Sequence, residues 1–336
     1  MSRNSFLKIL FAGTIFVFLI MLLSLCIGRY FIPPEEVLRI LISNFFAIDI
    51  TWNASMYNVI MELRLPRILA GFLVGGSLAL AGAVYQGAFR NPLVSPDVLG
   101  VSHGASAGAC LAILGHFSLV GIQAFAFIGG IIAVVIALLI PKCMKNESQL
   151  LLVLSGIIVA GFMGALIGLM KYMANPDNEL ADITYWQLGS LAKVSWENLL
   201  YVAPLMIAIS LLLFAMRWRM NVISLHDKEA KSMGINIHRE RIGVILAATL
   251  LTASSVCLSG TIGWVGLIMP HLARLFAGGN HVRLFPLAFI LSGGFLVFID
   301  MLSRTLTQAE IPLGILCGFV GAPFFVWILV KQRRQL

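Results

Sequence analysis

Ten long apolar stretches follow one another along this chain, and they constrain its fold more than any other feature of the sequence. They cover residues 6–28, 68–89, 98–115, 119–140, 150–170, 199–216, 242–259, 262–277, 284–302 and 311–330. A helix needs about 20 apolar residues to cross the roughly 30 Å hydrocarbon core of a membrane. Of the 336 residues, 60% are hydrophobic and 11% are charged, so little is left to build a water-soluble domain. The sequence therefore predicts an all-α, polytopic membrane protein of about ten transmembrane helices, with residues 1–336 as a single transmembrane domain.

Several of these stretches are too short to cross the hydrocarbon core as simple helices, so we expect some broken or re-entrant helices. The segment 91–97, on the inner side, contains Pro92 and Pro96 between the second and third stretches. It forms either a tight turn or the entry to a half-helix. The glycine repeat over 100–108 that follows lets another helix approach closely, and we interpret it as a packing surface.

The basic residues are distributed unevenly between the two sides of the membrane. With Met1 placed inside, 16 of the 23 lysines and arginines fall on the inner side and seven on the outer side. The positive-inside rule then places both termini in the cytoplasm. The net charge of +8 is therefore a signal of topology and not of nucleic-acid binding. The first stretch follows Arg3 and Lys8, but it is long and no A-x-A cleavage site follows it, so we interpret it as an uncleaved helix.

Two polar segments interrupt the apolar pattern. The outer segment, 174–198, carries Tyr185, Trp186 and Trp196, which favour a short interfacial helix that serves either as an aromatic belt or at the mouth of a pathway. The inner segment, 217–241, is the most charged part of the chain, and residues 224–234 have the pattern of a short amphipathic helix. That helix is either a docking surface or a solvated loop.

The signatures of several enzyme classes are missing from the sequence. There is no HExxH and no GxxxxGK[ST] motif, so the chain has neither a zinc-protease signature nor its own ATP-binding loop. The five cysteines are isolated and predict no metal site. Ser102 and His103 are adjacent and point to different helix faces, which argues against an intramembrane serine protease. Few ionisable residues lie in mid-membrane, yet an ion-coupled secondary permease stays open as the alternative to the function described next.

Six motifs, taken in order, carry a resemblance to a known family. They are Arg-Leu-Pro-Arg at 64–67, Gln-Gly-Ala-Phe-Arg-Asn-Pro-Leu at 86–93, Leu-Gly-Val-Ser at 99–102, the run Gly260 to Arg274 with its Pro-His pair at 270–271, Glu-Ile-Pro-Leu-Gly at 310–314 and Gly-Ala-Pro-Phe-Phe at 321–325. In this order they resemble the FecCD family of ABC-transporter permeases. The resemblance covers nearly the whole chain.

The resemblance implies a type II ABC importer permease in a bacterial or archaeal cytoplasmic membrane. Such a subunit would pair with a second permease subunit, for which we expect a second copy of this chain, with a heterodimer as the alternative. It would bind two ATPase subunits that carry ATP and Mg, hold no cofactor itself, and receive cargo from an extracytoplasmic binding protein. The cargo we expect is a ferric siderophore, and haem, cobalamin or an oxyanion such as molybdate are the alternatives.

The resemblance also assigns roles to individual residues. The coupling segment, which would seat in the ATPase, contains Asp227, Glu229, Ala230 and Gly234. The arginines expected to dock the binding protein are Arg64, Arg67 and Arg304. The inner gate is expected at Asn146, Glu147 and Ser148, where Glu147 departs from the small hydroxyl residues of the family.

The three arginines have an alternative role. They could pair within the chain with Glu62, Asp300 or Glu310. Exposed pairs of that kind would contribute little to stability, whereas contacts with carboxylates of a binding protein would steer its association.

Overall fold

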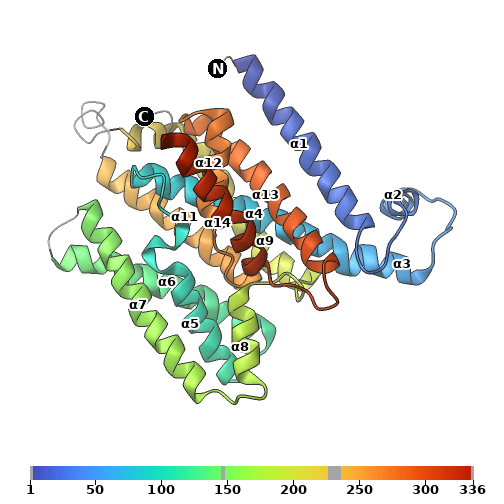
Figure 1. Ribbon diagram of the computed structural model, residues 1–336, viewed down its shortest axis with the longest axis horizontal. Coiled ribbons are helices and arrows are strands. Elements are labelled where there is room, and N and C mark those ends of the chain that lie inside the picture. Colours follow the sequence, from blue (N-terminus) through green and yellow to red (C-terminus); the bar gives the residue numbers. More distant parts are fainter. Residues whose placement is uncertain (1–2, 145–147, 226–235, 334–336) are drawn as a thin grey trace.

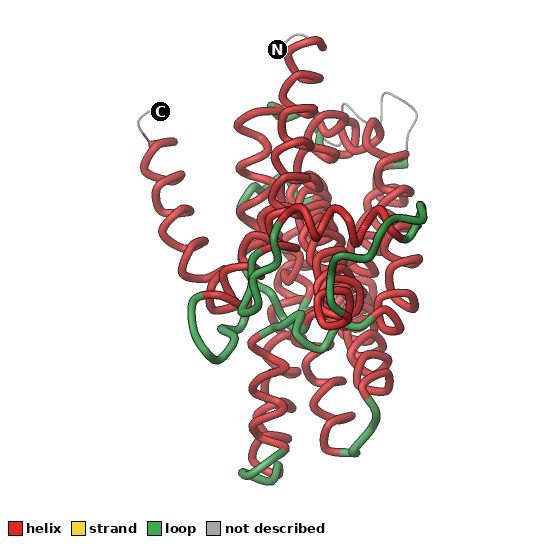
Figure 2. The backbone as a smooth tube through the Cα atoms, turned by 90° about the vertical axis from the view of Figure 1, so that its right-hand side faces the viewer, coloured by secondary structure: helices red, strands yellow, loops and turns green. Residues whose placement is uncertain are grey.

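The computed structural model describes residues 3–144, 148–225 and 236–333, and these ranges consist of helices joined by loops, without a strand (Figure 1). Each of the ten apolar stretches forms a helix. These helices are α1 (Arg3–Cys26), α4 (Leu65–Ala88), α5 (Val101–Leu114), α6 (Leu119–Cys143), α7 (Gln149–Met173), α9 (Trp196–Ile223), α11 (Ile237–Ser259), α12 (Val265–Ala277), α13 (His281–Thr305) and α14 (Leu313–Arg333). Among the described residues, seven helical spans are long and apolar enough to cross a membrane, which confirms a multi-pass protein. Both ends of the chain lie at the same end of the molecule (Figures 1 and 2).

The helices pack in two groups around α4 and α5. In the first group α4 contacts α9, α11, α12 and α13, and α1 packs chiefly on α13. In the second group, at the lower left of Figure 1, α5, α6 and α7 pack on one another, with α8 (Glu179–Leu188) against α5. Helix α11 contacts both groups, so it joins them into one bundle.

The composition of α4 explains its place at the centre of the bundle. Most of its residues are buried, and many are Gly or Ala, which allow neighbouring backbones to approach. A Cβ atom at Gly82 would lie 1.8 Å from the carbonyl oxygen of Gly266 on α12. That oxygen lies four residues before Pro270, which has no N–H to bond it within the helix. Only glycine at position 82 therefore lets α4 cross α12 at this point.

Helices α5 and α12 are too short to span the membrane. At 1.5 Å per residue, their 14 and 13 residues extend over about 20 Å, less than the roughly 30 Å hydrocarbon core, and we refer to α5 and α12 as the half-helices. The chain enters α5 through the 3₁₀ helix η2 (Pro96–Leu99) and through Gly100, whose φ of +75° suits glycine. The glycine repeat is confirmed as packing, because Cβ atoms at Gly104 and Gly108 would lie 2.4 and 2.0 Å from backbone oxygens of α6.

The outer side agrees with the sequence-based expectations at one point and departs from them at others. Helices α2 (Pro34–Ser43) and α3 (Ala54–Asn58) were not predicted, and α3 continues into α4 through a π-helical turn, η1 (Val59–Arg64). The short helix expected within 174–198 is present as α8. Trp196, however, is not a lipid-facing anchor, because its indole N–H donates to the carbonyl oxygen of Met61 at 2.7 Å.

Candidate functional site

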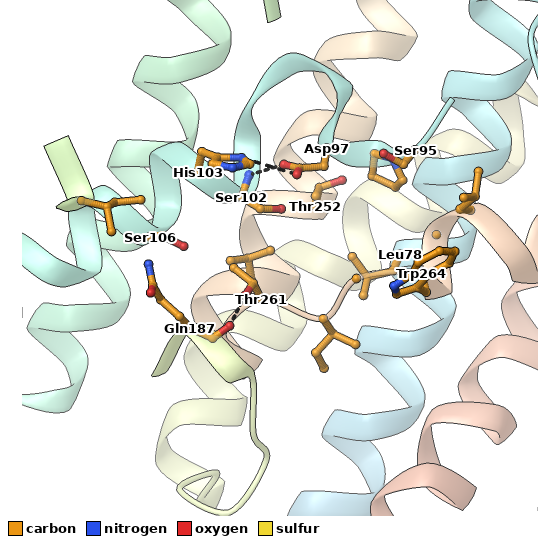
Figure 3. Close-up of a pocket in the computed structure, with 17 residues that line it drawn as sticks. Leu78, Ser95, Asp97, Ser102, His103, Ser106, Gln187, Thr252, Thr261 and Trp264 are labelled. Carbon is orange, nitrogen blue, oxygen red and sulfur yellow. Dashed lines mark hydrogen bonds and ion pairs between the residues drawn. The ribbon is translucent and has the colours of Figure 1, made fainter. Parts of the chain in front are cut away.

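A cavity of about 460 Å³ with both polar and apolar walls lies between the two half-helices (Figure 3). Its wall is formed by the first turns of α5 and α12, by η2, by α11, and by the end of α8. The residues that line it are Leu78, Ser95, Pro96, Asp97, Ser102, His103, Ser106, Ile167, Gln187, Thr252, Val256, Thr261, Ile262, Gly263, Trp264, Gly266 and Leu267. None of them is a lysine or an arginine.

Asp97 and His103 form a polar pair at the start of α5 (Figure 3). One carboxylate oxygen of Asp97 accepts the backbone N–H of Ser102 at 3.0 Å, which satisfies one of the free amides of the first helical turn. The other oxygen lies 3.5 Å from Nδ1 of His103. The side chain of His103 is 45% exposed and lines the cavity.

Hydroxyl and amide groups line the rest of the polar wall. Thr252 donates to the carbonyl oxygen of Ala248 at 2.8 Å, so its oxygen lone pairs remain available. Ser106 is 4% exposed and its oxygen points into the cavity, towards the amide of Gln187 (Figure 3). Within the described residues no three His, Cys, Asp or Glu side chains come together as metal ligands.

A second cavity of about 330 Å³ lies on the side of the α5–α6 loop, and residues that line the two cavities are near neighbours in the segments 186–190 and 257–262. The hydroxyl of Thr261 donates to the carbonyl oxygen of Gln187, and the N–H of Ser190 donates to Ser259 at 2.8 Å. The start of α14 is bonded to the same segment, because the N–H of Leu313 donates to the carbonyl oxygen of Gly189 at 2.9 Å. The segments that end α8, end α11 and begin α14 are therefore tied together between the two cavities.

The Arg67 cluster consists of Arg67, Asp300, Arg304 and Glu310. Arg67, 7% exposed, donates from Nε to both carboxylate oxygens of Asp300 at 2.9 and 3.0 Å, and from Nη1 and Nη2 to Glu310 at 3.1 and 2.9 Å. Arg304 contacts the same carboxylate of Asp300 at 3.2 Å and donates to the hydroxyl of Ser24 at 2.6 Å. The cluster thus joins α1, α4, α13 and the loop before α14.

Arg64 has a different environment. It is 5% exposed, and its guanidinium donates to the carbonyl oxygens of Leu25, Cys26 and Tyr30, where α1 ends. All three arginines expected to dock a binding protein are therefore buried and bonded within the chain. Asp300 and Glu310, named above as local partners, are the partners observed, whereas Glu62 makes no described contact with these arginines. These contacts favour the structural alternative, and docking stays a prediction.

The residues expected to couple to an ATPase lie outside the described part of the chain, as do two of the three gate residues. These residues are Asp227, Glu229, Ala230, Gly234, Asn146 and Glu147. Ser148 is described, and its hydroxyl caps α7 by accepting the N–H of Leu151 at 3.2 Å. The two helices that bracket the coupling segment are joined at their ends, because Arg219 on α9 pairs with Glu240 on α11 at 2.9 Å. Asn221 also accepts the N–H of His281 at 2.8 Å and so ties α9 to α13.

Comparisons with known proteins agree along nearly the whole chain. The model of the FecCD transport family matches residues 15–331. The molybdate import system permease MolB of Haemophilus influenzae is 38% identical over 334 residues, covering 99% of this chain and 98% of MolB. A probable iron chelatin transport system permease of Helicobacter pylori is 40% identical over 281 residues, covering 83% of this chain and 85% of that protein.

A solved structure agrees in fold as well as in sequence. It is described as an inward-facing conformation of a metal-chelate type ABC transporter, and it matches with a TM-score of 0.87 and 37% identity over 96% of this chain and 99% of that one. The fold described above, with its half-helices and its buried α4, therefore matches that of a known ABC transporter. The chain belongs to the FecCD transport family of ABC-transporter permeases.

Proposed function

We propose that this chain is the membrane subunit of an ABC importer that receives cargo from an extracytoplasmic binding protein and is driven by two partner ATPases. The observation that supports this most directly is the family match over residues 15–331, in a chain whose half-helices leave a cavity lined in part by polar side chains. The ATPases would carry ATP and Mg. A second copy of this chain would complete the pathway.

The segment 217–241 is the proposed contact with the ATPase. The pair Arg219–Glu240 and the Asn221–His281 contact hold the ends of α9, α11 and α13 together, so a displacement of this segment would reach three spans at once. We expect Gly234→Pro and Glu229→Lys to abolish uptake while membrane insertion persists. Expression, ATPase binding and uptake measured side by side test this, and normal uptake with both variants would remove the assignment.

The proposed cargo is a ferric siderophore, the class expected from the sequence. Molybdate, haem and cobalamin are the alternatives, and relatives of this chain are named for the import of molybdate, hemin and cobalamin.

Reconstitution tests the proposed function. The chain, its ATPase and its binding protein are placed in liposomes, and uptake of iron chelate and of molybdate is measured with ATP inside, outside or replaced by a non-hydrolysable analogue. We expect uptake that requires both ATP hydrolysis and the binding protein. Uptake that instead follows an imposed proton or sodium gradient, without ATP, would establish the ion-coupled alternative.

The subunit state is a separate part of the proposal. Mass measurement of the ATP-hydrolysing complex in mild detergent should give two permease chains. A complex with a single permease chain would contradict this, and a second, different permease would establish the heterodimer.

A further inference from the structure

Helix α2 has an apolar side that is wider than the surface it packs. At 3.6 residues per turn, one side of the helix carries Val37, Leu38, Ile40, Leu41 and Ile42, and the other side carries its charged residues. Val37 and Ile40 are buried in a cluster that includes the last turn of α1. Leu38 and Ile42, which are neighbours at i and i+4, are exposed. Part of the apolar side of α2 is therefore left uncovered by the described part of the chain.

The loop after α2, residues 44–52, adds to this uncovered apolar surface. Phe45, Phe46 and Ile50 are 83%, 69% and 77% exposed, and Ile48 between them is also exposed. Single apolar side chains at a protein surface are ordinary, whereas several together mark a site of interaction with a protein or a membrane. We refer to α2 and this loop together as the α2 segment, residues 34–52.

Hydrogen bonds hold both ends of the loop in place. Asn44 accepts the hydroxyl of Tyr57 at 3.3 Å. At the other end, Thr51 donates to the carboxylate of Glu36 at 2.8 Å and accepts from the guanidinium of Arg39 at 3.1 Å. The polar side chains at the two ends are thus bonded to α2 and α3, and the exposed apolar side chains lie between two fixed points.

The position of the α2 segment selects lipid as its partner. Most of α1 is left unburied by the rest of the protein, as expected for a span that faces lipid, and Leu19 and Leu23 near its end are exposed. Because α2 packs on the last turn of α1, it lies at the depth where this span leaves the hydrocarbon core. Figure 1 shows α2 beside the end of α1 that is opposite the N-terminus, at the edge of the bundle. The exposed side chains of α2 are therefore next to the lipid-facing surface of α1.

The charges of this region indicate which force would hold it at a membrane. Between α1 and α4, residues 27–63 contain two basic residues and four acidic ones, which are Arg29, Arg39, Glu35, Glu36, Asp49 and Glu62. A segment with this balance is not attracted to anionic headgroups. Burial of apolar side chains in the interface between headgroups and acyl chains is the remaining force.

We propose that the α2 segment is an interfacial membrane anchor on the outer side of the bilayer. Phe45, Phe46 and Ile50 enter the lipid beside the end of α1, and the charged side of α2 stays in water. The anchor fixes the depth of the connection between α1 and α4. The contact needs neither the binding protein nor the ATPase, so it does not rest on the proposed function.

Spin labelling of the full-length chain in nanodiscs of zwitterionic lipid tests the anchor. Cys143→Ser removes the exposed cysteine, and a nitroxide is attached at Phe46→Cys or at Ile50→Cys. The rate of collision with oxygen, which concentrates in the bilayer, is divided by the rate with a neutral nickel chelate, which stays in water. Glu35→Cys is the matched control, because Glu35 lies on the charged side of the same helix with a side chain 72% exposed.

We expect this ratio to be roughly threefold or more higher at Phe46 and Ile50 than at Glu35, as for side chains that enter about 5–10 Å into the interface. Salt at about 1 M should leave the ratio unchanged, because it screens charges and not apolar burial. Equal ratios at the three positions would place the loop in water and overturn the anchor. A ratio that falls in high salt would overturn apolar insertion. If added binding protein lowered the nickel collision rate at Phe46 from such a water-like value, the surface would instead be a docking site for that protein.

Discussion

Removal of Arg67 should destabilise the fold more than removal of any exposed arginine pair. Arg67 makes hydrogen bonds to two carboxylates, and one of these, Asp300, is only 1% exposed. In Arg67→Met the buried carboxylate keeps Arg304 as its one remaining cation, at 3.2 Å. Breaking a buried ion pair by removing one partner costs about 3–5 kcal/mol.

We expect the lower end of that range for Arg67→Met. The contact between Asp300 and Arg304 persists, and Glu310, with a side chain 23% exposed, can turn towards water. A loss of about 3 kcal/mol lowers the ratio of folded to unfolded chain by roughly 100-fold. Asp300→Asn should cost at least as much, because it leaves two buried guanidiniums without their shared carboxylate.

Arg39 provides the control. It pairs with Glu35 at 2.7 Å, but the two side chains are 41% and 72% exposed, so Arg39→Met should cost less than about 1 kcal/mol. The assay is equilibrium unfolding of all variants in mixed detergent micelles. If Arg67→Met unfolds like Arg39→Met and only its association with the binding protein is lost, the structural role is refuted and Arg67 is a docking residue.

Three further predictions concern packing, topology and the base of the coupling segment. Gly108→Leu should abolish folding, because a Cβ atom there would lie 2.0 Å from the carbonyl oxygen of Phe125. The control Gly161→Leu should fold normally, because nothing lies within 4 Å of a Cβ atom at that position. The yield of monodisperse protein is measured for both variants. Cys143 is the exposed one of the five cysteines, and a membrane-impermeant maleimide should label it in inside-out vesicles only; labelling in right-side-out vesicles would contradict cytoplasmic termini. Arg219→Ala, which removes the pair with Glu240, should lower uptake more than ATPase binding, and equal losses would argue against a role in transmitting motion.

The sequence predicts the helices better than the polar contacts. Apolar runs mark ten of the helices, including the short α5 and α12, because hydropathy is a property of the sequence alone. Helices α2 and α3 escape the same reasoning, since they carry charged and polar residues and lie outside the apolar runs. Pro66 follows the π-helical turn directly and has no N–H for a helical hydrogen bond, so it was a local signal of the irregular helix before α4.

The polar sites depend on contacts between distant parts of the chain. Arg67 and Asp300 are 233 positions apart, and nothing in their local sequence indicates that both are buried at one crossing of α4 and α13. The cavity joins Ser106, Gln187 and Thr252 from three separate helices. The contact of Asp97 with the start of α5 has no local signal either, because Asp97 accepts from the N–H of Ser102 five residues further on, whereas a helix-capping side chain accepts from the residue two or three positions on.

The half-helices α5 and α12 have a consequence for how the protein is made. A span of 13 or 14 residues leaves polar backbone ends in the hydrocarbon if it enters the membrane alone. Helix α5 packs on α6, and α12 packs on α4 and α13, so each has a longer neighbour that can shelter those ends. Insertion of α5 should therefore wait for synthesis of α6, and insertion of α12 for synthesis of α13. If synthesis stopped after α5 but before α6, or after α12 but before α13, the shorter helix would stay in the translocon and would not move into the lipid.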